Sequence, residues 1–128
     1  MEHNKERPID FRIFKDVDFP EQNYSEGAVI LDAGAAGGVM YILKAGRVAV
    51  QLNGVTVEEI DEGDIFGEMA LIDRLPRSAA IVALTKVVTI PIDEKRFLQL
   101  ISKVPHIALR VMRTLIRRIR AMNDKFEN

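Results

Sequence analysis

Six short runs rich in Val and Ile, separated by turn signals, limit the folds open to this chain more than any other feature. Asn53-Gly54 lies between two of the runs and favours a two-residue β-hairpin, because both central residues of such a turn adopt positive φ. Strands at this spacing predict a mainly β fold with α, an antiparallel β jelly-roll barrel over about residues 20–92. The runs cover residues 28–31, 39–43, 47–52, 55–60, 79–84 and 87–92.

The hydrophobic pattern changes from strand to helix spacing near the end of the barrel. Asp93 can cap a helix that carries an apolar stripe, and Pro105 suits the first turn of a longer helix after it. The C-terminal helices are therefore expected over about residues 94–123. The stretch at residues 8–17 predicts a short N-terminal helix that flanks the barrel.

Length and composition are those of one globular domain. The chain has 128 residues and 48% hydrophobic content, so residues 1–128 are expected to form a single domain. Its apolar runs are too short to span a bilayer, and its N-terminus is polar, so we expect no membrane association. There is no cysteine, which excludes disulfides and thiolate metal sites, and a cytoplasmic location is the default expectation.

The longer C-terminal helix carries an apolar seam with the 4, 3, 4, 3 spacing of a short coiled coil. This spacing predicts a homodimer through residues 105–123, with Val111 and Ile116 facing the barrel. The alternative is a helix that packs its apolar face on its own barrel. The seam consists of Ala108, Met112, Leu115, Ile119 and Met122.

The same helix is rich in arginine but has no nucleic-acid motif. From Lys103 onward there are seven basic residues and two acidic ones. Nothing resembles a helix-turn-helix, and no aromatic residues alternate with the arginines, so nucleic-acid binding by this chain is not expected. The simpler explanation of the arginines is that they form a solvated helix face, favoured near the C-terminal end of the helix dipole.

Few histidine or cysteine residues are available in this chain to build a catalytic site or a metal site. The chain has two histidines, His3 near the N-terminus and His106 at the start of the long helix, and no cysteine. We therefore expect no enzyme activity and no metal site. The acidic cluster at residues 58–64 lacks the spacing of a calcium loop and is interpreted as a solvated turn.

Glu68 and Arg77 are charged residues inside an otherwise apolar stretch. Burial of either group is costly unless a partner compensates its charge. One interpretation is a Glu68–Arg77 salt bridge that closes the loop. The other is a ligand that carries both a phosphate and a sugar, because a guanidinium suits phosphate oxygens and an ionised carboxylate accepts hydrogen bonds from hydroxyl groups.

The sequence around the two charges is more specific than the pair itself. "GDIFGEMALIDRLPRSAAIVALT" (63–85) resembles the phosphate-binding cassette of cyclic nucleotide-binding domains, in which G-E-aliphatic-A-L is followed by P-R-(S/T/A)-A. "EGAVILDAG" (26–34) is similar to the early strands of that family, and "MYILKAGRVAV" (40–50) is similar to its aromatic-then-Gly hairpin.

This resemblance implies a ligand site on matching residues. Arg77 would contact the cyclic phosphate with help from Ser78 and the backbone near Ala70, and Glu68 would accept from the ribose 2′-OH close to the backbone of Gly67. Val50 and Val57 would line the base pocket, Arg118 would lie near the phosphate, and Met122-Asn123 would lie near the base, where family members have small hydroxyl residues. The implied set is Gly67, Glu68, Met69, Ala70, Arg77, Ser78, Ala79, Val50, Val57, Arg118 and Asn123.

The resemblance also implies a function. We expect a non-enzymatic cyclic nucleotide sensor that signals to a downstream effector protein through movement of its C-terminal helix. A hydroxyl after the arginine, as in Ser78, occurs in cGMP-responsive kinases and in bacterial cAMP receptors, and the catabolite activator-like architecture favours cAMP, with cGMP as the alternative. Nothing resembling a DNA-binding domain follows, so the chain is either a stand-alone sensor or a fragment. The competing interpretation is a ligand-free dimerisation module with the same fold.

Overall fold

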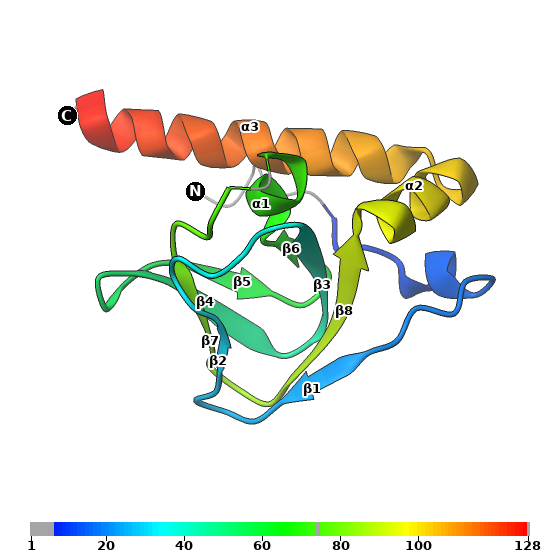
Figure 1. Cartoon of the computed structure of the whole chain (residues 1–128), viewed down its shortest axis with the longest axis horizontal. Coiled ribbons are helices and arrows are strands. Elements are labelled where there is room, and N and C mark those ends of the chain that lie inside the picture. The colour runs from blue at the N-terminus through cyan, green and yellow to red at the C-terminus, as the bar shows by residue number, and fades with distance from the viewer. Residues whose placement is uncertain (1–6, 74, 128) are drawn as a thin grey trace.

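The computed structural model describes residues 7–73 and 75–127, with side-chain surroundings as far as Ala121. Strands dominate the first three quarters of the chain, and helices end it (Figure 1). In chain order the elements are the 3-10 helix η1 (Phe11–Phe14), β1 (Gln22–Tyr24), β2 (Val29–Leu31), β3 (Val39–Ala45), β4 (Arg47–Leu52), β5 (Val55–Asp61), β6 (Ile65–Phe66), α1 (Glu68–Asp73), β7 (Ala80–Ala83), β8 (Val87–Asp93), α2 (Glu94–Lys103) and α3 (His106–Glu127).

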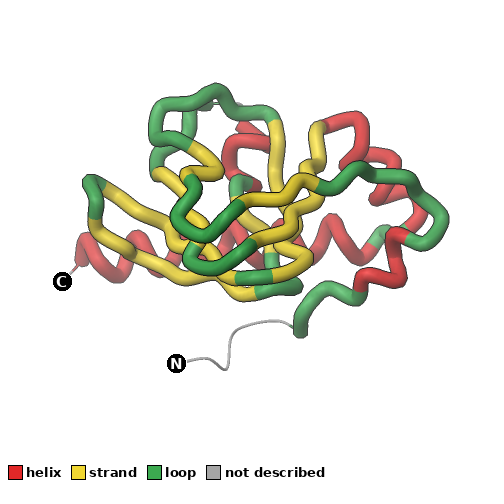
Figure 2. Tube along the Cα trace, turned by 90° about the horizontal axis from the view of Figure 1, so that it is seen from below, coloured by secondary structure: helices red, strands yellow, loops and turns green. Residues whose placement is uncertain are grey.

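The strands form two four-stranded sheets in which every pairing is antiparallel. One sheet has the order β1-β8-β3-β6 and the other β2-β7-β4-β5. The strands wrap around a common interior, and α3 runs along one side of them (Figures 1 and 2). This arrangement confirms the predicted jelly-roll barrel with C-terminal helices.

The β4–β5 hairpin forms where the sequence predicts it. Asn53 has φ 52° and Gly54 has φ 78°, the two positive values that a two-residue turn of this kind requires. Both flanking strands begin at the predicted residues. The local turn chemistry therefore sets the register of this hairpin.

The interior contains two clusters of buried apolar side chains. The first lies under the helices, where Met40 and Ile42 of β3 meet Leu100 of α2 and Val111 of α3. The second lies between the two sheets around Leu43, Val48, Ile60, Phe66, Ile81, Ala83 and Val87. Strand β3 contributes to both clusters, which places it between the helical layer and the barrel interior.

Helix α2 begins at the predicted cap. The side chain of Asp93 accepts a hydrogen bond of 2.8 Å from the backbone N–H of Arg96, which satisfies one of the free donors in the first turn. The helix continues to Lys103. Its apolar face packs through Leu100, Phe97 and Ile101 against the first cluster.

The predicted N-terminal helix is shorter than expected. It is a single 3-10 turn, η1, whose cap Asp10 accepts a 3.0 Å hydrogen bond from the backbone of Arg12. The Arg12 guanidinium also binds the Asp10 carboxylate, and these hydrogen bonds lower the pKa of Asp10 to about 2. Four residues are too few for a stable α-helix without extensive packing, which explains the shorter turn.

Helix α3 exposes an apolar stripe that only partly matches the predicted seam, since Met112 and Ile119 are exposed as predicted. Val111 faces the barrel as expected, but Ile116 is 50% exposed, so its predicted inward orientation is wrong. Leu115, predicted to lie in the outward seam, instead packs on the first cluster. The exposed apolar side chains form an outer stripe, defined here as Leu109, Met112, Ile116 and Ile119.

The helical period explains this difference. Ile107, Val111 and Thr114 are buried and share one face, and the outer stripe lies on the opposite face with spacing 3, 4, 3. The helix is apolar on both faces, so spacing alone cannot choose between them. Met122, the last residue of the predicted seam, has a side chain outside the described residues. No helix in the described ranges has the length and apolar character needed to cross a membrane.

Candidate functional site

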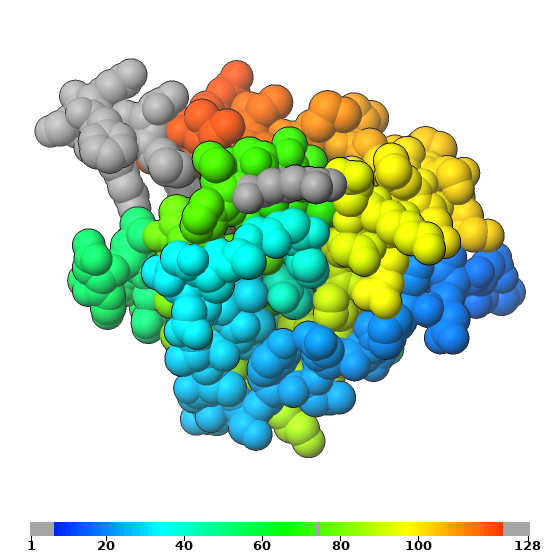
Figure 3. Space-filling view, viewed as in Figure 1, coloured from blue at the N-terminus to red at the C-terminus, as the bar shows by residue number. Residues whose placement is uncertain are grey.

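The cassette residues lie where the barrel meets the helices. Strand β6 ends at Phe66, Gly67 turns the chain with φ 75°, and α1 begins at Glu68. The chain then returns through Arg77 to β7. In the space-filling view α1 (green) lies directly beneath α3 (orange) and beside the β2–β3 loop (cyan) (Figure 3).

Arg77 is buried and held mainly by backbone carbonyl groups. Its Nη1 donates to the carbonyl of Gly67 at 2.9 Å, and its Nη2 donates to the carbonyl of Val39 at 2.5 Å. The whole residue is 8% exposed. Its Nε is buried and has no hydrogen-bond partner among the described residues.

No carboxylate compensates the Arg77 charge in the described part of the chain. The described ion pairs involve other arginines or Lys44. Arg77 instead lies over the ring of Tyr41, with its Cζ 5.9 Å from the ring centroid. Burial lowers the pKa of Arg77, which is the direction expected when desolvation disfavours the cation. A buried cation with an unused N–H is the chemistry of an anion site.

Gly67 is required by the approach of Arg77. A Cβ on Gly67 would lie 2.6 Å from Nη1 of Arg77, which is closer than real Cβ contacts allow. Its φ of 75° also falls in the region that favours glycine. The glycine of the cassette therefore leaves space for the guanidinium and turns the chain from β6 into α1.

The β2–β3 loop fixes both ends of the cassette through its backbone. Gly34 donates to the carbonyl of Arg77 at 2.7 Å, and the N–H of Arg77 donates to the carbonyl of Ala35 at 2.9 Å. At the other end, Gly38 donates to the carbonyl of Ala70 at 2.8 Å. A Cβ on Gly37 would lie 2.9 Å from the Ala70 Cβ, so the loop and α1 are in close contact.

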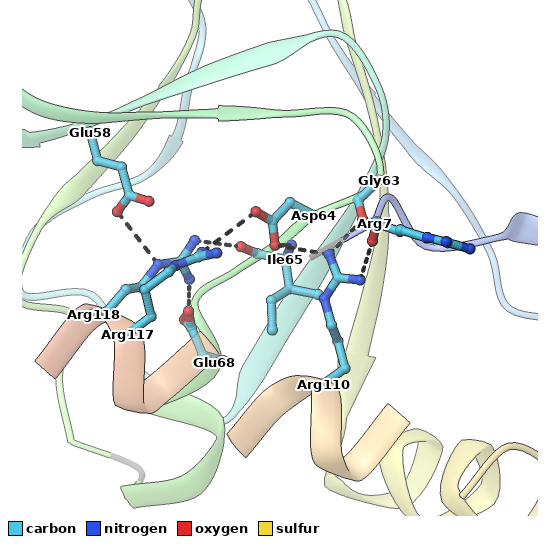
Figure 4. A network of polar contacts seen from close by, with 9 residues as sticks. All are labelled: Arg7, Glu58, Gly63, Asp64, Ile65, Glu68, Arg110, Arg117 and Arg118. Atoms are coloured by element: carbon cyan, nitrogen blue, oxygen red, sulfur yellow. Dashed lines mark hydrogen bonds and ion pairs between the residues drawn. The ribbon is translucent and has the colours of Figure 1, made fainter. Parts of the chain in front are cut away.

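Glu68 is paired with an arginine from the distant helix α3. Its carboxylate forms an ion pair with Nη1 of Arg118 (Figure 4), and only 4% of the Glu68 side chain is exposed. Arg118 also donates to the carbonyl of Ile65 at 3.0 Å and lies 3.4 Å from the Glu58 carboxylate. One side chain of α3 thus joins β5, β6 and α1.

Two more arginines of α3 contact the turn between β5 and β6. Arg110 and Arg117 lie 3.5 and 3.6 Å from the Asp64 carboxylate (Figure 4). Arg110 also donates to the carbonyl of Gly63 at 3.2 Å and to the carbonyl of Arg7 at 2.5 Å. These contacts connect α3 to the turn and to the N-terminal segment.

The acidic cluster at residues 58–64 is therefore not simply a solvated turn. Asp64 and Glu58 face arginines of α3, while Asp61 and Glu59 lie 2.9 and 3.6 Å from Arg47. Among the described residues, no group of three or more His, Asp or Glu side chains is arranged to hold a metal ion.

The two charges singled out in the sequence have separate partners. Arg77 donates to backbone carbonyls, whereas Glu68 pairs with Arg118. The Glu68–Arg77 salt bridge is not among the ion pairs of the described residues, so that interpretation is wrong. Both side chains nevertheless extend from the same cassette, because Glu68 is the first residue of α1 and Arg77 follows that helix.

The other predicted site residues vary in burial. Ala70 is buried, Met69 and Ala79 are half-buried, and Ser78 next to Arg77 is exposed. In the β4–β5 hairpin, Val50 is half-buried on the second cluster and Val57 is 38% exposed. Asn123 lies within α3, but its side chain is outside the described residues. Arg118 lies beside Glu68, and its predicted approach to a phosphate stays a prediction.

Several residues that shape the site are not in the predicted set. Val39 and Tyr41 of β3 contact Arg77, and Gly37 packs on α1. The quoted stretch that begins at Met40 contains Tyr41, but only the fold shows that this strand passes beside the cassette. Gly34, Gly37 and Gly38 of the β2–β3 loop indicate a turn, but only the fold places that turn against α1.

The fold is thus a jelly roll with a buried arginine beside a helical turn, and this arginine has no carboxylate partner among the described residues. The family model "Cyclic nucleotide-binding domain" matches residues 21–104. The chain belongs to the cyclic nucleotide-binding domain family.

Curated relatives include a kinase named for cGMP and a kinase regulatory subunit named for cAMP. The chain is 35% identical over 89 residues to a cGMP-dependent protein kinase of Toxoplasma gondii, and 37% identical over 89 residues to a cAMP-dependent protein kinase regulatory subunit of Aspergillus niger. The matches cover 70% and 68% of this chain but 9% and 22% of those relatives. The chain thus spans a small part of the length of these relatives.

The fold is also similar to solved structures. The catabolite activator protein of Thermus thermophilus superposes with a TM-score of 0.75 and 26% identity. The superposition covers 90% of this chain and 61% of that one. The similarity extends beyond the residues of the family match into the helical layer, because it includes nine tenths of the chain.

Proposed function

We propose that this domain binds a 3′,5′-cyclic nucleotide at the cassette and signals through α3 without catalysing a reaction. The observation that carries the proposal is the state of Arg77. The guanidinium is buried, both its Nη atoms are used by carbonyl groups, and its Nε–H has no partner among the described residues. A phosphate oxygen would accept from that N–H and compensate the charge.

The sugar of the ligand would bind at Glu68. An ionised carboxylate only accepts hydrogen bonds, and a ribose 2′-hydroxyl is a suitable donor. In the structure the Glu68 carboxylate is already engaged by Arg118. A sugar hydroxyl therefore has to share or replace the contact that holds α3 on the cassette.

This competition provides the switch. Arg118 is in α3, whereas Glu68 and Arg77 are in the cassette. A ligand on the cassette would therefore make the position in which α3 is held by the Glu68–Arg118 contact less stable relative to other positions of the helix. The helix would then pass the signal to an effector protein. A cytoplasmic location is part of the proposal.

The preferred nucleotide in this proposal is cAMP. A solved structure in its cAMP-bound form, 30% identical to this chain, supports that choice, although curated relatives named for cAMP and for cGMP both match the cassette region. Ser78 follows Arg77 and is exposed, so its hydroxyl is available to a ligand with either base. We expect cAMP to bind more tightly than cGMP.

We also propose that the protein forms a homodimer through α3. The outer stripe supports this, because its four side chains are each about half exposed and repeat with coiled-coil spacing. This arrangement keeps the predicted range, residues 105–123, but replaces Ala108 and Leu115 by Leu109 and Ile116 at the interface. The dimer is compatible with ligand binding and would also be expected of a module that had lost its ligand.

Displacement of a fluorescent cAMP analogue tests the binding proposal. Unlabelled cAMP is expected to displace the probe, cGMP to displace it less well, and 2′-deoxy-cAMP to compete more weakly than cAMP because it lacks the donor for Glu68. Adenosine 5′-monophosphate is the control, since it has the same base and sugar without the cyclic phosphate. Failure of the probe to bind the folded protein, or equal competition by all four nucleotides, would contradict the proposal.

A further inference from the structure

Tyr41 of β3 lies beside Arg77, and the proposed function gives it no role. The Cζ atom of Arg77 lies over the Tyr41 ring at 5.9 Å from its centroid. We propose that Tyr41 is a positioning residue, whose ring face holds the guanidinium of Arg77 so that its Nε–H stays directed at the ligand. This inference rests on the proposed function and adds a residue to its phosphate site.

The Tyr41 ring is itself held rigidly. It stacks on Phe66, with ring centroids 5.0 Å apart and an angle of 6° between the planes. Phe66 is 1% exposed and pairs with Tyr41 across β3 and β6, while Pro91 of β8 pairs with Tyr41 on its other side. A ring fixed by a buried neighbour in the middle of a sheet can define the position of a side chain that rests on it.

Arg77 needs such a support because its hydrogen bonds do not restrain the tilt of its planar guanidinium. The carbonyls of Gly67 and Val39 accept hydrogen bonds from its two Nη atoms and so hold the guanidinium along its N–H bonds. They supply no countercharge. The electron-rich face of an aromatic ring attracts a cation and restrains the tilt of a planar guanidinium.

The ring and one of the carbonyls come from the same strand. Val39 and Tyr41 are two residues apart in β3, so the carbonyl of Val39 and the ring of Tyr41 contact Arg77 from the same part of the strand. The position of Arg77 is therefore set by β3 together with Gly67. Because no carboxylate in the described ranges pairs with it, the arginine keeps its charge available for an anionic ligand.

Two substitutions separate the ring from the hydroxyl. Tyr41→Phe keeps the ring face, and we expect its affinity for cAMP to match that of the wild type. Tyr41→Leu removes the ring, and we expect about fivefold weaker binding. Tyr24→Leu is the matched control, because it removes the other tyrosine, which packs on the second cluster, and is expected to lower stability without changing affinity.

The same Tyr41 substitution in Arg77→Ala protein identifies the cause of any loss of cAMP affinity. In Arg77→Ala protein, Tyr41→Leu is expected to weaken cAMP binding no further, because the side chain that the ring positions is gone. The proposal would be overturned by wild-type affinity in Tyr41→Leu, by equal losses in Tyr41→Phe and Tyr41→Leu, or by the same loss in both backgrounds.

The Nε–H resonance of Arg77 in the ligand-free protein supplies a readout that needs no nucleotide. A ring current from Tyr41 is expected to shift this signal in wild-type and Tyr41→Phe protein, and the shift is expected to vanish in Tyr41→Leu. An unchanged signal in Tyr41→Leu would overturn the positioning role. If the wild type bound no cyclic nucleotide, the proposed function would fail, and this resonance would still decide whether the ring positions Arg77.

Discussion

Arg118 of α3 and Glu68 of α1 form an ion pair in which 12% and 4% of the two side chains are exposed. The pair joins the longest helix to the residue proposed to accept a hydrogen bond from the ligand's sugar. A contact between the proposed signalling element and the proposed ligand site is the simplest physical link between binding and a helix movement. The first prediction tests it.

Arg118→Gln should destabilise the ligand-free protein and strengthen cAMP binding. Loss of the guanidinium leaves the buried Glu68 carboxylate without its ion-pair partner, which costs on the order of 3 kcal/mol. The carboxylate is then free for a sugar hydroxyl, and we expect affinity to rise by about fivefold or more. Urea unfolding and cAMP titration measure the two effects. Arg120→Gln, on the exposed side of the same helix, is the control and should change neither; unchanged affinity in Arg118→Gln would contradict the competition.

Gly67→Ala should weaken cAMP binding more than its effect on the backbone explains. The added Cβ would lie 2.6 Å from Nη1 of Arg77 and must displace it. The positive φ alone costs about 1 kcal/mol. Gly27→Ala is a matched control, because Gly27 has φ 86° and nothing within 4 Å of an added Cβ.

The two glycine variants should therefore lose similar stability from backbone strain, while Gly67→Ala alone loses affinity. Thermal unfolding and cAMP titration of both variants make the comparison. Equal affinities in the two would show that Gly67 does not serve Arg77.

Ile116→Glu should convert a dimer into a monomer. Ile116 is 50% exposed in the centre of the outer stripe, and a carboxylate there would be buried against a second copy. Leu98→Glu, which changes an exposed leucine of α2, is the control and should leave the mass unchanged. Sedimentation velocity gives the masses, and a dimer that persists in Ile116→Glu would place the interface elsewhere.

Alkaline pH should reduce stability partly through Tyr41. Burial raises the pKa of Tyr41, with Arg77 opposing the shift. Because the folded pKa lies above the unfolded value near 10, the neutral phenol favours the folded state. That contribution is present below about pH 10 and is lost as pH rises through the folded pKa. Urea unfolding at about pH 8 and about pH 11 should show a smaller loss for Tyr41→Phe than for the wild type, and equal losses would contradict this account.

Features encoded by neighbouring residues could be predicted from the sequence. The β4–β5 hairpin follows from the turn chemistry of Asn53-Gly54, and the start of α2 follows from the cap at Asp93. Strand β1 was not predicted, because its three residues, Gln22–Tyr24, carry no strand pattern and are ordered by pairing with β8.

Contacts between distant segments could not be predicted in the same way. Sequence spacing offered Arg77 as a partner for Glu68, but the fold supplies Arg118 from 50 positions further along the chain than Glu68. The outward face of α3 was likewise undetermined, because apolar residues occur on both faces and only packing selects which one is buried. The ring of Tyr41 reaches Arg77 for the same reason, through strand order rather than spacing.

The central claim is that Arg77 binds the phosphate of a cyclic nucleotide, and calorimetric titration tests it most directly. Wild-type protein titrated with cAMP is expected to give saturable heat, with cGMP binding more weakly. Arg77→Ala, verified as folded by circular dichroism, is expected to bind cAMP at least about tenfold more weakly, because a charge-assisted hydrogen bond is lost. Absence of heat and of thermal stabilisation with both nucleotides, or wild-type affinity in Arg77→Ala, would contradict the account.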